Sequence, residues 1–264
     1  MNIFFRELRA NLKSLLIWSG IVILFIVVGF SKFSAFYGNP DLLAILDSVP
    51  PAALAALNLN AFNLTTVTGF FGVMVTYFAL ILSISAAMWG SDIISKEERD
   101  KTVEFSLTLP VTRGRLVTAK AAAVVVNCIV LLLVTGGITL VSAQKYQPDS
   151  AFYDFVSMTM LAFLFLQMIF LAIGIFLGCA MKKHKRAGSV AVSLLLGTYF
   201  VSIISGLSED LEFLRYVSPF KYFDPALLLR ESRFDITFVV LSVAIIAVCL
   251  ASAYVIYAKR DLYI

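Results

Sequence analysis

The charged side chains that could do chemistry are concentrated in one segment, residues 94–115, which lies between two long uncharged apolar runs. Glu97 lies four residues before Lys101, so the two side chains can pair along one face of a helix. Lys96 and Asp100 repeat this spacing. Ion pairs at this spacing stabilise a helix in water, so the segment predicts a charged helix with a functional role, and a solvated loop is the alternative.

No arrangement of residues typical of catalysis accompanies this segment. The single histidine, His184, lies in the basic run 181–186, and neighbouring cations make it a poor metal ligand or general base. The phosphate-binding pattern GxxxxGK followed by Ser or Thr is absent, and no glycine precedes a lysine. The sequence therefore predicts no catalytic residue, no metal site and no ATP site in this chain.

The composition predicts that the elements around the charged segment lie in lipid. Only 14% of the residues are charged, about half the share in soluble domains, and the mean hydropathy is +0.93. Six runs contain no Asp, Glu, Lys or Arg and are long enough to cross a bilayer, and they do not alternate as barrel strands do. These predicted transmembrane helices are residues 15–31, 64–91, 121–144, 155–181, 187–208 and 236–258.

The distribution of basic residues predicts the orientation of these helices. With the N-terminus inside, fifteen Lys and Arg residues lie in the inner segments and six in the outer ones. Because inner loops carry the excess of Lys and Arg, we expect a multi-pass membrane protein with both termini in the cytoplasm. The net charge of +4 then follows from topology, and no nucleic-acid partner is needed to explain it.

Shorter helices are expected at the ends of the spans. Residues 2–14 combine apolar residues at helical spacing with a basic side, which suits either an interfacial helix or a charged start to the first span. Ser208 and the pair Asp224–Pro225 are typical helix starts, so short outer helices are expected before the sixth span. The predicted fold class is an all-α integral membrane protein with a single domain over residues 1–264.

The charged segment itself is predicted to begin with a short helix. Ser91 or Asp92 can cap a helix that runs to about Phe105, and Pro110 ends the element because the residue before proline disfavours helix. Lys120 can extend its ammonium group to the membrane surface from the first turn of the third span. This gives a short, two-faced helix held between two spans.

Small and amide residues inside the spans suggest how the helices pack. Small residues at four-residue spacing let helix backbones approach closely in lipid, within one chain or between two. The candidates for helix packing or a dimer interface are Gly174, Gly178, Ser193, Gly197, Ser202 and Gly206. Asn127 and Gln167 are the most polar interior residues, and single amides more often bond between helices than form a pathway.

The order of residues in the charged segment resembles the inner-loop signature of ABC-2 type transporter permeases. That pattern runs roughly E-x-x-x-G/K-T-x-E-x-L-L-x-x-P-x-S/T-R, followed by a lysine, and the six-helix plan is similar to that of type V exporters. Lys101 stands where many members have Gly, and Ser106 stands where many have Leu. The matching positions are Glu97, Glu98, Arg99, Asp100, Lys101, Thr102, Val103, Glu104, Phe105, Leu107, Leu109, Pro110, Thr112, Arg113 and Lys120.

The resemblance implies a permease subunit of the bacterial cell membrane that pairs with a second chain, identical or homologous, and with two ATPase subunits. Those subunits would bind ATP and Mg, and this chain would bind no cofactor. A cytoplasmic coupling helix between the second and third spans would dock on the ATPase, and the implied coupling residues are Ile94, Glu97, Glu98, Arg99, Lys101, Thr102, Glu104, Pro110 and Arg113. A second contact would consist of Lys182, Lys183, Lys185 and Arg186, although topology alone also explains that basic run.

The cargo and two other function classes stay open at this point. Uncharged spans suit an amphipathic cargo, and the chain resembles small permeases that export antimicrobial or toxin peptides of the phenol-soluble-modulin type. We expect an amphipathic peptide, with sodium, polysaccharide and lipid as alternatives. An autonomous carrier or channel is a second class, which the charge-free spans disfavour. A non-transporting membrane scaffold or sensor, which would use residues 92–115 to bind a cytoplasmic partner, is a third.

Overall fold

The structure, a computed structural model, describes residues 3–39, 50, 54, 62–99, 112–181, 184–207 and 209–259. In these ranges the chain is helical and contains no strand. Six helices are long and apolar enough to cross a membrane, as predicted. They are α1 (Ile3–Phe33), α4 (Val67–Arg99), α6 (Arg113–Ala143), α7 (Ser150–Ala180), α8 (His184–Ser205) and α11 (Ile236–Lys259).

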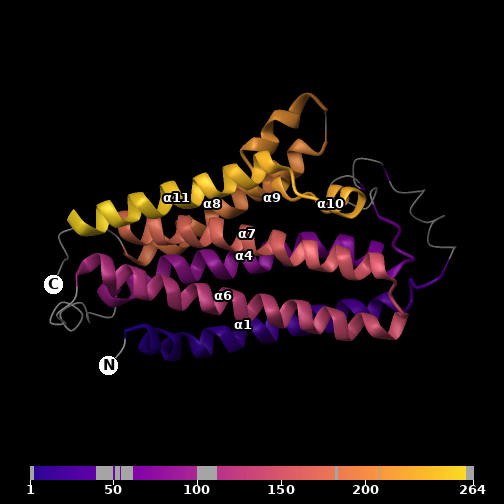
Figure 1. The fold of residues 1–264 in the computed structure, drawn as a ribbon, viewed down its shortest axis with the longest axis horizontal. Helices are drawn as coiled ribbons and strands as arrows, with labels where there is room; N and C mark the ends of the chain where they lie inside the picture. Colours follow the sequence, from indigo (N-terminus) through magenta and orange to yellow (C-terminus); the bar gives the residue numbers. More distant parts are fainter. Residues whose placement is uncertain are drawn as a thin grey trace.

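The six long helices run side by side along one direction, with α4 and α7 in the middle (Figure 1). Helices α1 and α6 pack on one side of this pair, and α8 and α11 pack on the other. The start of α1 and the end of α11 lie at the same end of the bundle, which we call the terminal end. The end of α4 and the start of α6 lie there too, so the charged segment joins two helices at the terminal end.

The central pair is packed backbone to backbone. A Cβ atom added to Gly174 of α7 would lie 2.5 Å from the carbonyl oxygen of Ala87, and one added to Gly90 of α4 would lie 2.5 Å from that of Leu171. Such distances leave no room for a side chain, so glycine is required for this approach. Consistent with a central position, 61% of the most apolar window of α4 is buried, against 11% in α11. The outer faces left exposed are apolar and suit lipid.

Aromatic residues join three helices at the end of the bundle opposite the terminal end. Phe33 of α1 stacks on Phe70 of α4 with ring centroids 4.6 Å apart. Tyr146, in the 3-10 helix η2 (Gln144–Tyr146) that follows α6, lies 4.7 Å from the Phe33 ring and donates a hydrogen bond to the Phe30 carbonyl oxygen at 3.0 Å. These contacts fix α1, α4 and α6 to one another away from the charged segment.

Short helices connect α8 to α11, as predicted. They are η3 (Glu209–Tyr216), α9 (Pro219–Tyr222) and α10 (Pro225–Glu231). Asp224 caps α10 by accepting a hydrogen bond from the Ala226 amide at 2.9 Å, and Pro225 occupies the first turn. Ser208, the other predicted start, lies outside the described residues.

The amphipathic N-terminal residues do not form a helix of their own. Helix α1 is continuous from Ile3 to Phe33, so residues 3–14 are the charged start of the first span, one of the two expected arrangements. The physical reason is that no proline or glycine lies between Ile3 and Gly20, and nothing else ends the helix.

Candidate functional site

Helix α4 continues without interruption from the membrane span into the charged segment. The Ser91 hydroxyl donates to the Met88 carbonyl oxygen at 3.0 Å, and the Ser95 hydroxyl donates to the Ser91 carbonyl oxygen at 2.6 Å. Serines that bond back to carbonyls in this way lie inside a helix and do not cap it. The predicted helix start at Ser91 or Asp92 is therefore wrong, and the helix extends to Arg99.

The predicted coupling residues divide into those that the structure describes and those outside it. Ile94 is 3% exposed and packs in the core, and Arg113 is the first residue of α6. Glu97, Glu98 and Arg99 lie in the last turn of α4, where only the backbone is described. Four further residues lie outside the described ranges, namely Lys101, Thr102, Glu104 and Pro110. Their part in ATPase binding stays a prediction.

A buried ion pair joins the charged segment to the first helix. The Lys96 ammonium on α4 binds the Glu7 carboxylate on α1. The Glu7 side chain is 2% exposed and that of Lys96 is 16% exposed, so water screens this pair poorly. The Arg6 guanidinium is a second, more distant partner of Glu7 at 3.4 Å.

A buried lysine joins α6 to α4 next to this ion pair. The Lys120 ammonium donates to the carbonyl oxygen of Ile93 at 3.0 Å, and Lys120 is 1% exposed. The prediction that Lys120 extends to the membrane surface is wrong. Its ammonium group lies between helices because a carbonyl oxygen of α4 is available within reach of its side chain.

The start of α6 also contacts the end of α11. The Arg113 guanidinium donates to the carbonyl oxygens of Tyr257 at 3.3 Å and Ala258 at 3.4 Å. Carbonyls at a helix C-terminus carry partial negative charge, so a cation there is stabilising. One turn further along α6, the hydroxyls of Thr118 and Tyr254 form a hydrogen bond at 2.8 Å.

These contacts form a continuous set across the terminal end. Glu7 and Lys96 join α1 to α4, Lys120 joins α4 to α6, and Arg113 joins α6 to α11. The two helix ends that flank the charged segment are therefore each bound to a further span. Sequence reasoning missed Glu7, because its partner lies 89 residues away along the chain.

The second predicted ATPase contact is described only in part. Arg186 is exposed in the first turn of α8, whereas Lys182, Lys183 and the Lys185 side chain lie outside the described residues.

The small residues proposed for helix packing differ in what they face. Gly174 and Gly178 face α4 within the chain. On α8, Ser193 and Gly197 are exposed, and a Cβ added to Gly197 would meet no atom within 4 Å. Ser202 is buried and donates to the Tyr199 carbonyl oxygen, and Gly206 lies near Lys221.

The two interior amides are buried, with exposures of 1% for Asn127 and 0% for Gln167. Neither the amide nitrogen of Asn127 nor either polar atom of Gln167 has a hydrogen-bond partner among the described residues. The hydrogen bonds between helices that the sequence suggested for these nitrogens are therefore not found there.

Comparison with known families decides what kind of membrane protein this is. The family model described as ABC-2 family transporter protein matches residues 1–262, nearly the whole chain. The chain belongs to the ABC-2 transporter family. This permease is thus a transmembrane subunit of a transporter, and in this family the ATPase is a separate partner. No curated protein matches the chain closely enough to add a relative.

Proposed function

We propose that this ABC-2 permease is the membrane subunit of an ATP-driven exporter and that residues 94–104 receive the force of ATP binding. The observation that supports this most directly is the continuity of α4, which runs the length of the bundle from Val67 to Arg99 and enters the charged segment without a break. A helix transmits an axial displacement along its length because its backbone hydrogen bonds are continuous. A displacement of the segment would therefore reach the spans directly.

The contacts at the terminal end would distribute that displacement. The Glu7–Lys96 pair would carry it to α1, and Lys120 would carry it to α6. ATP and Mg would bind to two partner ATPase subunits, and Lys182, Lys183, Lys185 and Arg186 would form a smaller second contact with them. The positive-inside distribution of Lys and Arg supports a cell-membrane location with both termini and this contact in the cytoplasm.

A second permease chain would complete the translocation pathway. The exposed small residues on α8, Ser193 and Gly197, support close packing with that chain. Long apolar spans support an amphipathic peptide of the antimicrobial or toxin kind as cargo, exported from the inner leaflet or cytoplasm. These spans also contain few of the charged residues that mark ion pathways.

The test is charge reversal at the tip of α4. Glu97→Arg combined with Glu98→Arg should abolish cargo-stimulated ATP hydrolysis and export by the reconstituted complex, while the purified permease keeps its unfolding temperature. The matched control is Glu209→Arg combined with Glu212→Arg in η3, which reverses two charges between the fifth and sixth spans and should leave both activities unchanged. Full ATPase association and export in the Glu97, Glu98 variant would refute the coupling assignment.

A further inference from the structure

The outward face of α1 carries two cations near the terminal end. Arg9 and Lys13 are four residues apart, so their side chains lie next to each other on one face of the helix. Both are exposed, and neither makes an ion pair with another residue that the structure describes. Helix α1 packs on α6 and α4, and only 17% of its most apolar window is buried, so this face is open.

The carboxylate closest to these cations in sequence does not neutralise them. Glu7 precedes Arg9 by two residues, which places the two side chains about 200° apart around the helix axis. The Glu7 side chain is 2% exposed and binds Lys96 of α4, on the buried side of α1. The outward face therefore presents two positive charges to whatever surrounds the bundle.

Exposed apolar side chains flank the two cations on the same face. Phe5, one turn before Arg9, is 60% exposed, and Leu12 and Leu16 are 49% and 69% exposed. After Lys13, α1 contains no charged residue until Lys32. Cations that end where a long uncharged face begins are typical of the boundary between lipid head groups and acyl chains.

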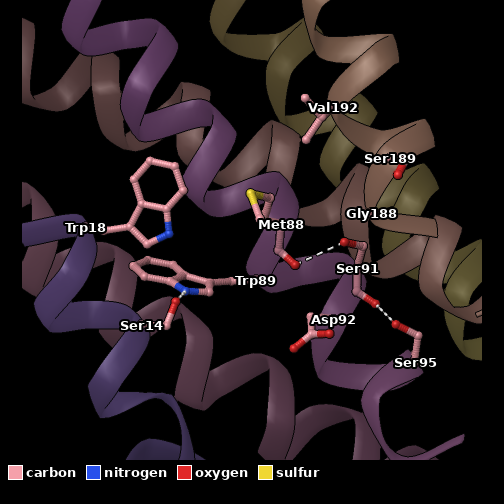
Figure 2. Close-up of a pocket in the computed structure, with 10 residues that line it drawn as sticks. All are labelled: Ser14, Trp18, Met88, Trp89, Ser91, Asp92, Ser95, Gly188, Ser189 and Val192. Atoms are coloured by element: carbon pink, nitrogen blue, oxygen red, sulfur yellow. Dashed lines mark hydrogen bonds between the residues drawn. The ribbon is translucent and has the colours of Figure 1, made fainter. Parts of the chain in front are cut away.

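The tryptophans of the chain mark this boundary at the same depth. Trp89 of α4 donates a hydrogen bond from its indole nitrogen to the hydroxyl oxygen of Ser14, the residue after Lys13, at 2.8 Å. Ser14, Trp18 and Trp89 help to line a pocket of about 760 Å³ between α1, α4 and α8 (Figure 2). Because tryptophan is enriched where head groups meet hydrocarbon, Lys13 lies at the depth of the lipid phosphates.

We propose that Arg9 and Lys13 bind the phosphate of an anionic phospholipid in the leaflet at the terminal end. Its acyl chains lie along Leu12 and Leu16. A guanidinium and an ammonium group one turn apart supply several N–H donors to phosphate oxygens. A zwitterionic lipid brings its own cation next to these two, so a lipid with net negative charge is favoured.

The apolar flanks decide between a lipid and a soluble partner. A nucleic acid or a free anion would contact the two cations and leave Phe5 and Leu16 in water, whereas a lipid covers both kinds of group. The proposal goes beyond the function above, because lipid binding requires neither an ATPase nor transport. It therefore stands or falls separately from the coupling assignment.

Quenching of tryptophan fluorescence by brominated lipids tests the proposal, because both tryptophans of the chain lie next to Ser14. The purified permease is placed in phosphatidylcholine bilayers, and phosphatidylglycerol with brominated acyl chains is added in steps. Phosphatidylcholine with the same brominated chains is the comparison. We expect half-maximal quenching at a mole fraction about tenfold lower for the phosphatidylglycerol, since each Lys or Arg beside an anionic lipid strengthens binding. Equal quenching by the two lipids would overturn the proposal.

Two matched variants separate this face from general electrostatics. Arg9→Gln combined with Lys13→Gln should reduce the preference for phosphatidylglycerol to less than about twofold. The control is Lys32→Gln combined with Lys145→Gln, which removes two exposed cations at the opposite end of the bundle and should leave the preference unchanged. A preference that survives in the first variant, or that falls equally in the control, would refute the site. If the first variant does not fold, Arg9→Gln alone should reduce the preference about threefold, and no reduction would refute it.

Inorganic phosphate distinguishes a lipid from a soluble anion. Millimolar phosphate should relieve the quenching no more than sodium chloride of the same ionic strength does, because screening is then its only effect. Greater relief by phosphate would assign the two cations to a soluble anion and overturn the lipid assignment.

Discussion

Breaking the Glu7–Lys96 pair should destabilise the permease by more than an exposed ion pair can. In Lys96→Met, the Glu7 carboxylate stays 2% exposed, and the one partner left to it among the described residues is the Arg6 guanidinium at 3.4 Å. Loss of one partner from a fully buried pair costs about 3–5 kcal/mol, and the 16% exposure of Lys96 together with Arg6 reduces our expectation to about 2–3 kcal/mol. Glu7→Gln should cost less, about 1–2 kcal/mol, because the remaining Lys96 ammonium can reach water.

Thermal unfolding in detergent micelles measures these differences. For a chain of this size, 2–3 kcal/mol corresponds to a fall in unfolding temperature of about 5–10 °C. The double variant Glu7→Gln with Lys96→Met should be more stable than the sum of the single losses predicts, since no charge is left unpaired. Glu212→Gln is the control, because the Arg215–Glu212 pair is 41% and 65% exposed and should contribute less than about 1 kcal/mol. The buried pair would be refuted if each single variant lost less than about 0.5 kcal/mol of unfolding free energy and the double variant lost the sum of the two.

Two further substitutions test the packing of the bundle. Gly174→Ala should destabilise the permease by about 1–3 kcal/mol, because the new Cβ would lie 2.5 Å from the Ala87 carbonyl oxygen, whereas Gly137→Ala on α6 meets no atom within 4 Å and should be neutral or slightly stabilising. Equal unfolding temperatures for these two variants would contradict the close α4–α7 contact. Tyr146→Phe should cost about 1 kcal/mol through loss of the hydrogen bond to the Phe30 carbonyl oxygen. The hydroxyl is not bonded to Phe30 if its removal leaves thermal unfolding unchanged.

The spans could be predicted from the sequence because the signal for each is local. A run without charged residues is visible in one window, and all six runs correspond to helices in the structure. The cap of α10 at Asp224 is local as well, since the acceptor and the amide that it binds are two residues apart. The predicted helix start at Ser91 was wrong because a local signal can be ambiguous. A serine inside a helix and a serine at its start have similar neighbours in sequence.

The contacts at the terminal end and the pocket could not be predicted, because they combine residues from helices far apart in the chain. Glu7 resembles a surface residue of an amphipathic helix until α4 places Lys96 opposite it. The rows of small residues on α7 and α8 look alike in sequence, yet Gly174 contacts α4 and Gly197 faces outward. Which row packs inside the chain depends on the positions of the helices, and spacing alone does not determine them.

The backbone contact between α4 and α7 limits how the bundle can change shape. Gly90, Gly174 and Gly178 each leave room for a backbone atom of the opposite helix. Sliding one helix past the other by a single residue would bring a larger side chain against a carbonyl oxygen. We therefore expect α4 and α7 to move together as one unit in any conformational change, and the helices packed around this pair to move relative to it.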